Sequence, residues 1–333
     1  MEDSKIKLTP LLDTLYLGKL EDAIYFSPKY ANYISNSRLG LLKKDGPDAF
    51  LAGFADQGFK SCFALGSYIH ELTLQPDLFE LGPNLEKPTA KMGAMADHLY
   101  SCYLNNHVVT DKDIYEASDA VHYYKDKMNE DKCDQVRGAC IQYWKNRQAF
   151  EQSYQTTKTI EYTDPKSMEL VNGCINALAN DSRIQELLHP TDSFGEYIIS
   201  ENEQAILLDI QVDIEGRNPH IIHLKAKLDN YTIDKETNTI TINDVKTSSQ
   251  DTRDFANSIE AFSYYRELSW YAMLLSLYAT REYGMLNPII KGNFLVVSTK
   301  EPYYTAVYPM SPTLFKRGIE EYKHLLKQAS LLI

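Results

Sequence analysis

Four consecutive segments after Pro190 constrain the fold of this chain more than any other feature, because each has the pattern of a β-strand. Short apolar or alternating runs that are separated by turn residues are typical of neighbouring strands. The four segments cover residues 196–199, 205–212, 221–228 and 239–245. The polar stretch 234–239 predicts a hairpin loop between the last two strands. A chain with this series of strands is expected to build a sheet.

Helical patterns follow the strand region. We expect a long helix over 257–283, two more strands at 293–298 and 304–308, and a closing amphipathic helix that starts at Pro312. Strands and helices in this order predict an α/β fold, more strictly α+β mixed, in which helices flank a central mixed sheet.

The length of 333 residues fits either one large α/β domain with insertions or two domains of about 150 residues each. We expect a single domain over residues 1–333 that has three parts. These parts are a helical N-terminal segment over 1–60, a mainly helical insertion over 105–190, and a core of sheet and helix over 191–310.

The composition excludes several classes of protein. With 34 lysine and arginine residues against 46 aspartate and glutamate residues, the net charge of −12 argues against a protein that coats nucleic acid non-specifically. The five cysteines form no C-x-x-C pair, so we expect a reducing compartment and no iron–sulfur cluster. The N-terminus lacks the pattern of a secretory signal, and no run approaches the ~18 apolar residues of a membrane helix, so we expect a cytoplasmic protein.

Two residues of the predicted hairpin stand where the apolar pattern predicts core. Asp244 and Lys246 share a face with Ile240 and Ile242, because side chains alternate along a strand. On the preceding strand, Asp229 projects from a polar face at the strand end. A polar residue that breaks the apolar pattern of an otherwise regular strand is expected to mark a functional position.

Asp229 and Asp244, at adjacent strand ends, make a site of hard oxygen ligands that suits Mg²⁺ or Mn²⁺. The backbone carbonyl of Val245 offers a further ligand. Lys246 points the same way as Asp244 and could position or help deprotonate a water beside a phosphate, which is an arrangement for metal-assisted phosphodiester hydrolysis. The alternative is a surface hairpin in which an aspartate and a lysine form a weak cross-strand pair.

The same hairpin resembles a known nuclease signature. Asp229 followed by Asp244-Val-Lys246 is similar to the motif of the PD-(D/E)XK nuclease superfamily, and Gly66-Ser-Tyr-Ile-His70 resembles the histidine motif of its RecB-like branch. Two further motifs bring the resemblance closest to RecE-type phage and prophage exonucleases, the exonuclease VIII family. These motifs are Ser35-Asn-Ser-Arg-Leu39 and Leu74-Gln-Pro76. The resemblance covers residues from about 33 to about 308 and implies a restriction-endonuclease-like core.

The resemblance implies metal ligands and catalytic residues at matching positions. Asp229 and Asp244 would be the metal carboxylates, and Lys246 would be the catalytic lysine. His70 would contribute to a second metal position. The acid on the strand before the hairpin would be Glu196, although the spacing also leaves Glu201 possible.

Two positions depart from the pattern of the family. RecB-like nucleases usually carry a Gln-x-x-x-Tyr pair on the helix after the hairpin; here Tyr271 matches, but Glu267 stands where the glutamine is expected. The proline of the superfamily name is also missing, since Leu228 precedes Asp229. The role of Glu267 is therefore open at this point.

The resemblance implies a 5′→3′ exonuclease that resects double-stranded DNA ends, with Mg²⁺ as cofactor and Mn²⁺ able to substitute. Partners would be DNA ends and a single-strand annealing recombinase, in a bacterial or phage-infected cell, and relatives of this kind often form trimeric or tetrameric rings. Alternatives are an endonuclease or flap nuclease on the same fold, and a non-catalytic DNA-end-binding or anti-defence protein. Residues expected to contact DNA are Lys225, Lys227, Arg253, Arg266 and Ser67.

Overall fold

The structure of the chain, a computed structural model, describes residues 6–53, 61–106, 108–123, 128–191 and 197–333. The chain divides into two compact units. The first unit comprises Met1–Ala55, Leu178–Ser298 and Tyr304–Ile333, and the second comprises Asp56–Ala177 and Thr299–Tyr303. That the whole chain works as the single expected domain, with the parts 1–60, 105–190 and 191–310, remains a prediction.

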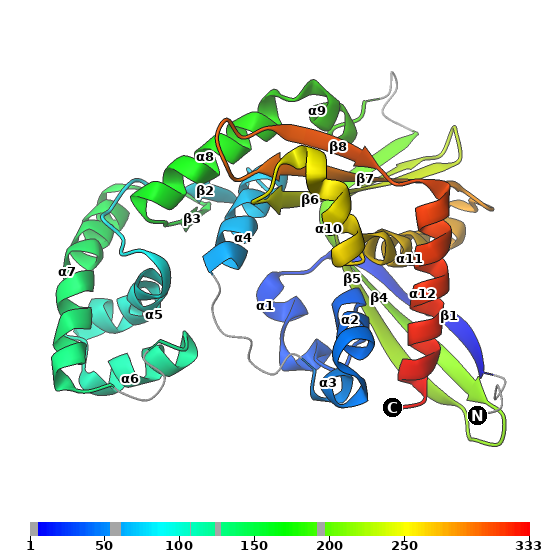
Figure 1. Cartoon of the computed structure of the whole chain (residues 1–333), viewed down its shortest axis with the longest axis horizontal. Coiled ribbons are helices and arrows are strands. Elements are labelled where there is room, and N and C mark those ends of the chain that lie inside the picture. Colours follow the sequence, from blue (N-terminus) through cyan, green and yellow to red (C-terminus); the bar gives the residue numbers. More distant parts are fainter. Residues whose placement is uncertain (1–5, 54–60, 107, 124–127, 192–196) are drawn as a thin grey trace. The chain divides into compact units, whose positions relative to one another are not determined.

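A six-stranded mixed sheet forms the centre of the first unit (Figure 1). Its strands follow the order β1, β4, β5, β6, β7 and β8. The pair β6–β7 is parallel, and the other neighbouring strands are antiparallel. The strands are β1 (Ile6–Lys19), β4 (Ile198–Ile214), β5 (His220–Asp234), β6 (Thr239–Ser248), β7 (Ile289–Ser298) and β8 (Thr305–Pro309). The predicted α/β fold with a central mixed sheet is therefore confirmed.

The start of the chain differs from the helical segment expected over 1–60, because the described residues begin with a strand, and short helices follow it only from Asp22 onward. β1 pairs with β4 and lies at one edge of the sheet. Its apolar side chains Ile6 and Leu8 pack against the core, which favours the extended form. Pro10 is compatible with an edge strand, where a missing N–H does not interrupt a central ladder.

The two strands expected at 196–199 and 205–212 form one long strand, β4. The polar residues between them remain paired with β5, as Asn202 lies opposite Asn230 and Gln204 lies opposite Leu228. Glu203, between them, has a left-handed backbone with φ 53°. Such a backbone is uncommon for a residue other than glycine and often marks a functional position.

Helix α11 (Tyr264–Tyr283) packs on β1, β4, β5 and β6, and α12 (Pro312–Ser330) packs on α11. The two helices approach closely at Gly318, where an added Cβ would lie 2.2 Å from the Ser269 hydroxyl oxygen. The single helix expected over 257–283 is broken, and α10 (Phe255–Ala261) is separate from α11. Ser263 makes the break with a left-handed backbone, φ 54°, and its hydroxyl accepts a hydrogen bond from Lys43.

This unit also contains the helices α1 (Asp22–Tyr25), α2 (Asn36–Asp45), α3 (Pro47–Ala52) and α9 (Ser182–Leu188). The hydroxyl of Ser35 caps α2 by accepting the backbone N–H of Arg38. Helix α9 touches the sheet through the carbonyl oxygens of Leu187 and Leu188, which accept from Asn243 and Asn230.

The second unit is mainly helical and has its own core, which includes Met95, Leu99, Val136 and Trp144. Trp144 donates its ring N–H to the carbonyl oxygen of Ala96 at 2.8 Å, so its one polar atom is satisfied inside this core. Its strands β2 (Phe79–Leu81) and β3 (Thr159–Glu161) form a parallel pair. Its helices are α4 (Ser61–Leu74), α5 (Ala90–Asn106), α6 (Asp111–Ala120), α7 (Glu130–Ser153) and the greater part of α8 (Pro165–Asn180).

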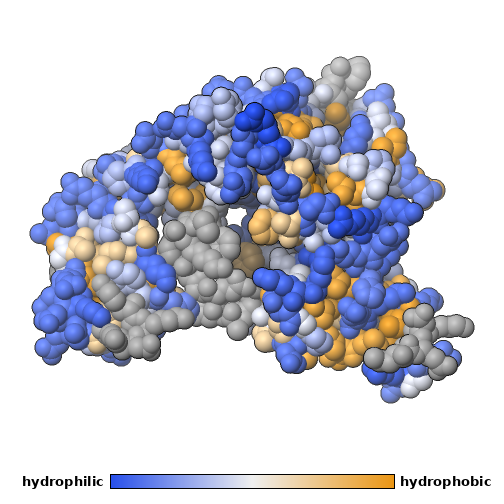
Figure 2. All heavy atoms as spheres, in the orientation of Figure 1, coloured by the Kyte–Doolittle hydropathy of each residue, from blue (hydrophilic) through white to orange (hydrophobic). Residues whose placement is uncertain are grey.

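Among the described residues, no helix combines the length and the apolar character that crossing a membrane requires. The face of the molecule drawn in Figure 2 is mostly hydrophilic, with hydrophobic side chains in scattered patches.

Candidate active site

The hairpin of β5 and β6 brings Asp229 and Asp244 together, as the sequence predicted. Asn230 and Asn243 are opposite one another in this antiparallel pair, and the two aspartates flank them. Asp229 Oδ2 accepts the backbone N–H of Val245 at 2.7 Å, which ties the middle of β5 to β6. The side-chain alternation that predicted this pair from the sequence is therefore present in the structure.

Glu203 on β4 is a third carboxylate of this cluster. One of its carboxylate oxygens lies within 4.8 Å of one from Asp229, and the residue is 9% exposed. Its carboxylate also pairs with the Lys227 ammonium at 2.6 Å. Three adjacent strands, β4, β5 and β6, thus each contribute one acid.

Glu203 was not predicted from the sequence. The predicted acids were Glu196, which lies outside the described residues, and Glu201, which is exposed and lies opposite Tyr231 on β5. The turn at Gly216, between β4 and β5, could have identified Glu203. Counting back along β4 from this turn in regular antiparallel register places Glu203 opposite Asp229. The left-handed backbone of Glu203 could not be read from the sequence.

Burial shifts the ionisation of both aspartates. Loss of hydration raises the pKa of Asp229 and of Asp244; the Lys246 ammonium opposes this shift, while neighbouring carboxylates add to it. Asp244 is 1% exposed, and its Oδ2 has no hydrogen-bond partner among the described residues. The Lys246 ammonium lies 2.7 Å from this oxygen as an ion pair, but at an angle that does not suit a hydrogen bond.

Lys246 stands among acids and an aromatic ring. Besides Asp244, its ammonium lies 3.4 Å from Glu267 Oε2 and 4.8 Å from the ring centre of Tyr264. Burial lowers the pKa of Lys246, but Asp244, Glu267 and Asp229 together outweigh burial and raise it well above its ordinary value. The side chain is consequently a cation at neutral pH, suited to neutralising a phosphate rather than to accepting a proton.

Glu267, which stands at the expected glutamine position on α11, connects two predicted site residues. Its Oε1 accepts a hydrogen bond from the Tyr271 hydroxyl at 3.1 Å, and its Oε2 faces Lys246. An acid can take the glutamine position here because Lys246 offsets its charge.

A cavity of about 470 Å³ lies beside Tyr271 in the first unit. Lys225 and Arg38 line it, both at least nine-tenths buried. Their charged groups contact backbone carbonyls: the Lys225 ammonium donates to Tyr25 at 3.0 Å, and the Arg38 guanidinium donates to Phe50 at 3.0 Å. Burial lowers the pKa of each cation, so an anion bound in this cavity would stabilise the charged form of both side chains.

Other predicted residues lie elsewhere. Arg266 is buried and is held by Glu321 at 2.7 Å and by Asn36, so we assign it a structural role. Arg253 is exposed and pairs with Asp251. His70 and Ser67 belong to α4 of the second unit, and their roles as metal ligand and DNA contact remain predictions.

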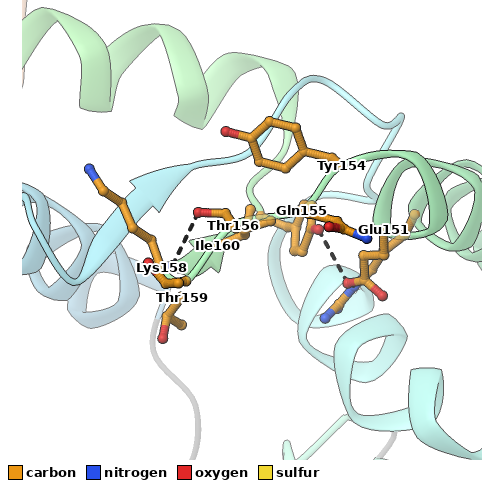
Figure 3. A pocket seen from close by; sticks show the side chains of 10 residues that line it. Glu151, Tyr154, Gln155, Thr156, Lys158, Thr159 and Ile160 are labelled. Atoms are coloured by element: carbon orange, nitrogen blue, oxygen red, sulfur yellow. Dashed lines mark hydrogen bonds and ion pairs between the residues drawn. The ribbon is translucent and has the colours of Figure 1, made fainter.

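The second unit holds a cavity of about 770 Å³, drawn in Figure 3. Polar side chains such as Gln155, Thr156 and Lys158 line it. Its acid, Glu151, already accepts from the Arg147 guanidinium at 2.8 Å and from the Tyr100 hydroxyl at 2.8 Å. We therefore place the candidate active site at the carboxylates of the first unit.

The donor set of the first unit fits a divalent cation. Glu203 and Asp229 offer carboxylate oxygens within 4.8 Å of one another, and Asp244 interacts electrostatically with Asp229. Mg²⁺ and Mn²⁺ prefer such oxygens. Asp244 Oδ2 is buried without a hydrogen bond among the described residues and has the Lys246 ammonium as its ion-pair partner, so a bound cation would satisfy it further. A carboxylate cluster that is held in a buried place usually binds metal or carries out catalysis.

Comparisons with known proteins give little further information. No protein-family model matches the chain, and no curated protein matches it. A solved structure from Eubacterium rectale, named "Putative exonuclease", matches with a TM-score of 0.43 and 8% identity, over 95% of this chain and 88% of that chain. A likeness this distant adds no weight to the site. The fold and the site define an α/β protein with a carboxylate and lysine cluster on its central strands. Asp229 and Asp244 were expected at strand ends, but both lie inside their strands, because β5 continues to Asp234 and β6 to Ser248.

Proposed function

We propose that this protein is a metal-dependent deoxyribonuclease that hydrolyses phosphodiester bonds. The observation that carries the proposal is the cluster of Glu203, Asp229 and Asp244 on three adjacent strands, with the Lys246 ammonium 2.7 Å from Asp244. Buried carboxylates in excess over nearby cations favour a bound divalent cation, and a lysine beside them favours an anionic substrate.

The three carboxylates and the backbone carbonyl of Val245 would hold Mg²⁺, for which Mn²⁺ can substitute. His70 is proposed as a ligand of a second metal position. A bound cation of this kind would supply Lewis-acid polarisation of the phosphate that is to be cut. The carboxylates contribute their negative charge and their fixed spacing.

Lys246 would neutralise and orient the scissile phosphate and hold the attacking water in line. Its raised pKa keeps the proton on the amine, so it acts as a cation and hydrogen-bond donor. Glu267 limits the swing of this side chain, and Tyr271 fixes Glu267 through its hydroxyl. The contacts of Lys246, Glu267 and Tyr271 thus support a role for each.

The positive cavity beside Tyr271 supports a DNA substrate. Lys225 and Lys227 line it, and phosphate contacts from such residues give affinity without reading sequence. Arg253 and Ser67 are proposed as further phosphate contacts.

The more specific proposal is a 5′→3′ exonuclease on double-stranded DNA that leaves single strands for an annealing recombinase. Its support is the motif resemblance to RecE-type exonucleases. A ring of three or four chains and a place in the cytoplasm of a bacterial or phage-infected cell belong to the same proposal.

A time course on linear duplex DNA, labelled at either the 5′ or the 3′ end, tests this function. Samples contain Mg²⁺, Mn²⁺ or EDTA, with a closed circular duplex and Lys246→Ala protein as controls. We expect early loss of the 5′ label, intact circles, and no cleavage with EDTA or with the variant. Nicked circles would instead support an endonuclease, and no metal-dependent cleavage of either DNA would contradict the proposal in favour of a non-catalytic DNA-end binder.

A further inference from the structure

Four asparagines form a continuous row across the central sheet, which we call the asparagine ladder. They are Asn202, Asn230, Asn243 and Asn293, on β4, β5, β6 and β7. Each lies opposite the next in the strand register, so the row runs straight across four strands.

The amides of the ladder are linked in one direction. Asn293 donates to Asn243 at 2.9 Å, Asn243 donates to Asn230 at 2.7 Å, and Asn230 donates to Asn202 at 2.7 Å. Asn243 and Asn230 also donate to the last carbonyls of α9, at Leu187 and Leu188. These carbonyls have no partner within the helix, so the ladder also satisfies the end of α9.

Each acid of the candidate active site is the immediate neighbour of a ladder residue along the chain. Glu203 follows Asn202, Asp229 precedes Asn230, and Asp244 follows Asn243. Because side chains alternate along a strand, the amides of Asn230 and Asn243 lie on the face opposite Asp229 and Asp244. The hydrogen bonds of the ladder therefore act on the same backbone positions that carry the acids.

The ladder makes a shift in the register of the strands unfavourable. Asn230 and Asn243 are fully buried, and Asn293 is 9% exposed. A buried amide is costly unless it is hydrogen-bonded, and a slip of one residue would break the row and turn the acids to the other face. Asparagine is also unfavourable in the middle of a sheet, so propensity does not account for four of them in one row.

We propose that the asparagine ladder is a positioning device that sets the spacing of Glu203, Asp229 and Asp244 for one divalent cation. This inference rests on the proposed function, because it takes the three carboxylates to be a metal site. The four asparagines are positioning residues, since they act on the cation through the neighbouring acids.

The test compares Asn243→Leu, which keeps the size of the side chain and removes its amide, with Thr232→Val. Thr232 lies on β5, two residues from Asn230 and on the same face, but it is not the neighbour of an acid. Mn²⁺ affinity is measured by calorimetry at a temperature where both variants are folded. We expect Asn243→Leu to weaken Mn²⁺ binding about 10-fold to 100-fold, as changes behind metal ligands do, and Thr232→Val to leave it within about 2-fold.

A readout without metal separates positioning from general stability. The backbone N–H of Val245 donates to Asp229, so its hydrogen exchange reports whether that carboxylate is in place. We expect faster exchange at Val245 in Asn243→Leu and unchanged exchange in Thr232→Val. If Asn243→Leu does not fold, Asn202→Ala replaces it, because Asn202 is less buried and gives only one acceptor to the ladder.

The folded ladder variant, Asn243→Leu or Asn202→Ala, could bind Mn²⁺ as tightly as the wild-type protein and exchange the Val245 N–H at the wild-type rate. This result would overturn the inference and leave the proposed function standing. A wild-type protein that binds no Mn²⁺ would overturn the proposed function, and the inference with it.

Discussion

Both units enclose charged side chains, but they balance the charge differently. In the second unit, the Arg147 guanidinium lies 2.8 Å from Glu151 and 3.3 Å from Asp97. The Lys87 ammonium lies 2.5 Å from Asp97, so two cations face two acids. The rings of Tyr100 and Tyr162 cover the guanidinium. In the first unit, the acids of the candidate site outnumber the ammonium groups beside them. These acids are Glu203, Asp229, Asp244 and Glu267, and the ammonium groups belong to Lys227 and Lys246.

The difference separates a structural network from a site that needs a ligand. A balanced network such as that of Arg147 satisfies each group and holds helices together. An unbalanced cluster destabilises the fold unless a cation joins it, and such a cost is retained where function requires it. The cavity of about 770 Å³ drawn in Figure 3 accompanies the balanced network, so cavity size alone does not identify the cluster that needs a ligand.

Substituting an acid of the unbalanced cluster should have the largest effect, which is on the rate of DNA cleavage. Glu203 and Glu201 form a matched pair, because they lie two residues apart on β4 and only Glu203 is buried. Glu203→Gln should lower the rate of DNA cleavage by about 10²-fold to 10³-fold, since it removes a metal ligand. Glu201→Gln should leave the rate within about 2-fold. Equal rates for the two variants in a single-turnover assay would remove Glu203 from the site.

The balanced network should respond in stability and not in catalysis. Arg147→Met removes the cation from Glu151 and Asp97 and should lower the free energy of unfolding by about 1–3 kcal/mol. Urea titration followed by circular dichroism measures the loss. The rate of cleavage per folded molecule should not change, and a loss of rate without a loss of stability would break the comparison.

The pH dependence of stability should differ with and without metal. The raised pKa values of Asp229 and Asp244 mean that the folded state binds protons more tightly than the unfolded state does. Their contribution to stability is therefore present at low pH and is lost as the pH rises from the ordinary aspartate pKa, about 4, to the raised pKa values of about 7 and about 8. Melting curves in EDTA should show this decline, and Mg²⁺ should reverse it by replacing the protons.

The smallest expected effect concerns Glu267. Glu267→Gln can keep the hydrogen bond from Tyr271 but removes a negative charge 3.4 Å from Lys246. The pKa of Lys246 should fall, so the alkaline limb of the cleavage profile should move to lower pH while the maximal rate changes by only about 2-fold to 5-fold. An unmoved alkaline limb would show that Lys246 does not control it.

The sequence allowed part of this site to be predicted and not the rest. Strand alternation was enough to select Asp244 and Lys246, because each is a polar residue at a core position. Glu203 was missed because its place beside Asp229 depends on the register of β4 against β5, which the local sequence does not reveal. The break at Ser263 was missed because a single left-handed residue leaves no periodic signal in the sequence.

The sheet was predictable in its centre and not at its edge. The β5–β6 hairpin was expected from the turn at 234–239 and its two apolar strands. β1 was not expected, because it pairs with β4, almost 200 residues away in the sequence, and such distant pairing has no local signal. The ladder asparagines show the same limit, since their alignment depends on the register of four strands.

Calorimetric titration of Mn²⁺ into the wild-type protein and into Asp244→Asn tests the central claim most directly. Asparagine keeps the size of the side chain and removes the charge of the most buried acid of the cluster, so the substituted protein should fold and should melt at a higher temperature without metal. The carboxylate cluster predicts saturable binding of Mn²⁺ to the wild-type protein and its loss in Asp244→Asn. Equal binding by both proteins would contradict the assignment of this cluster as the metal site.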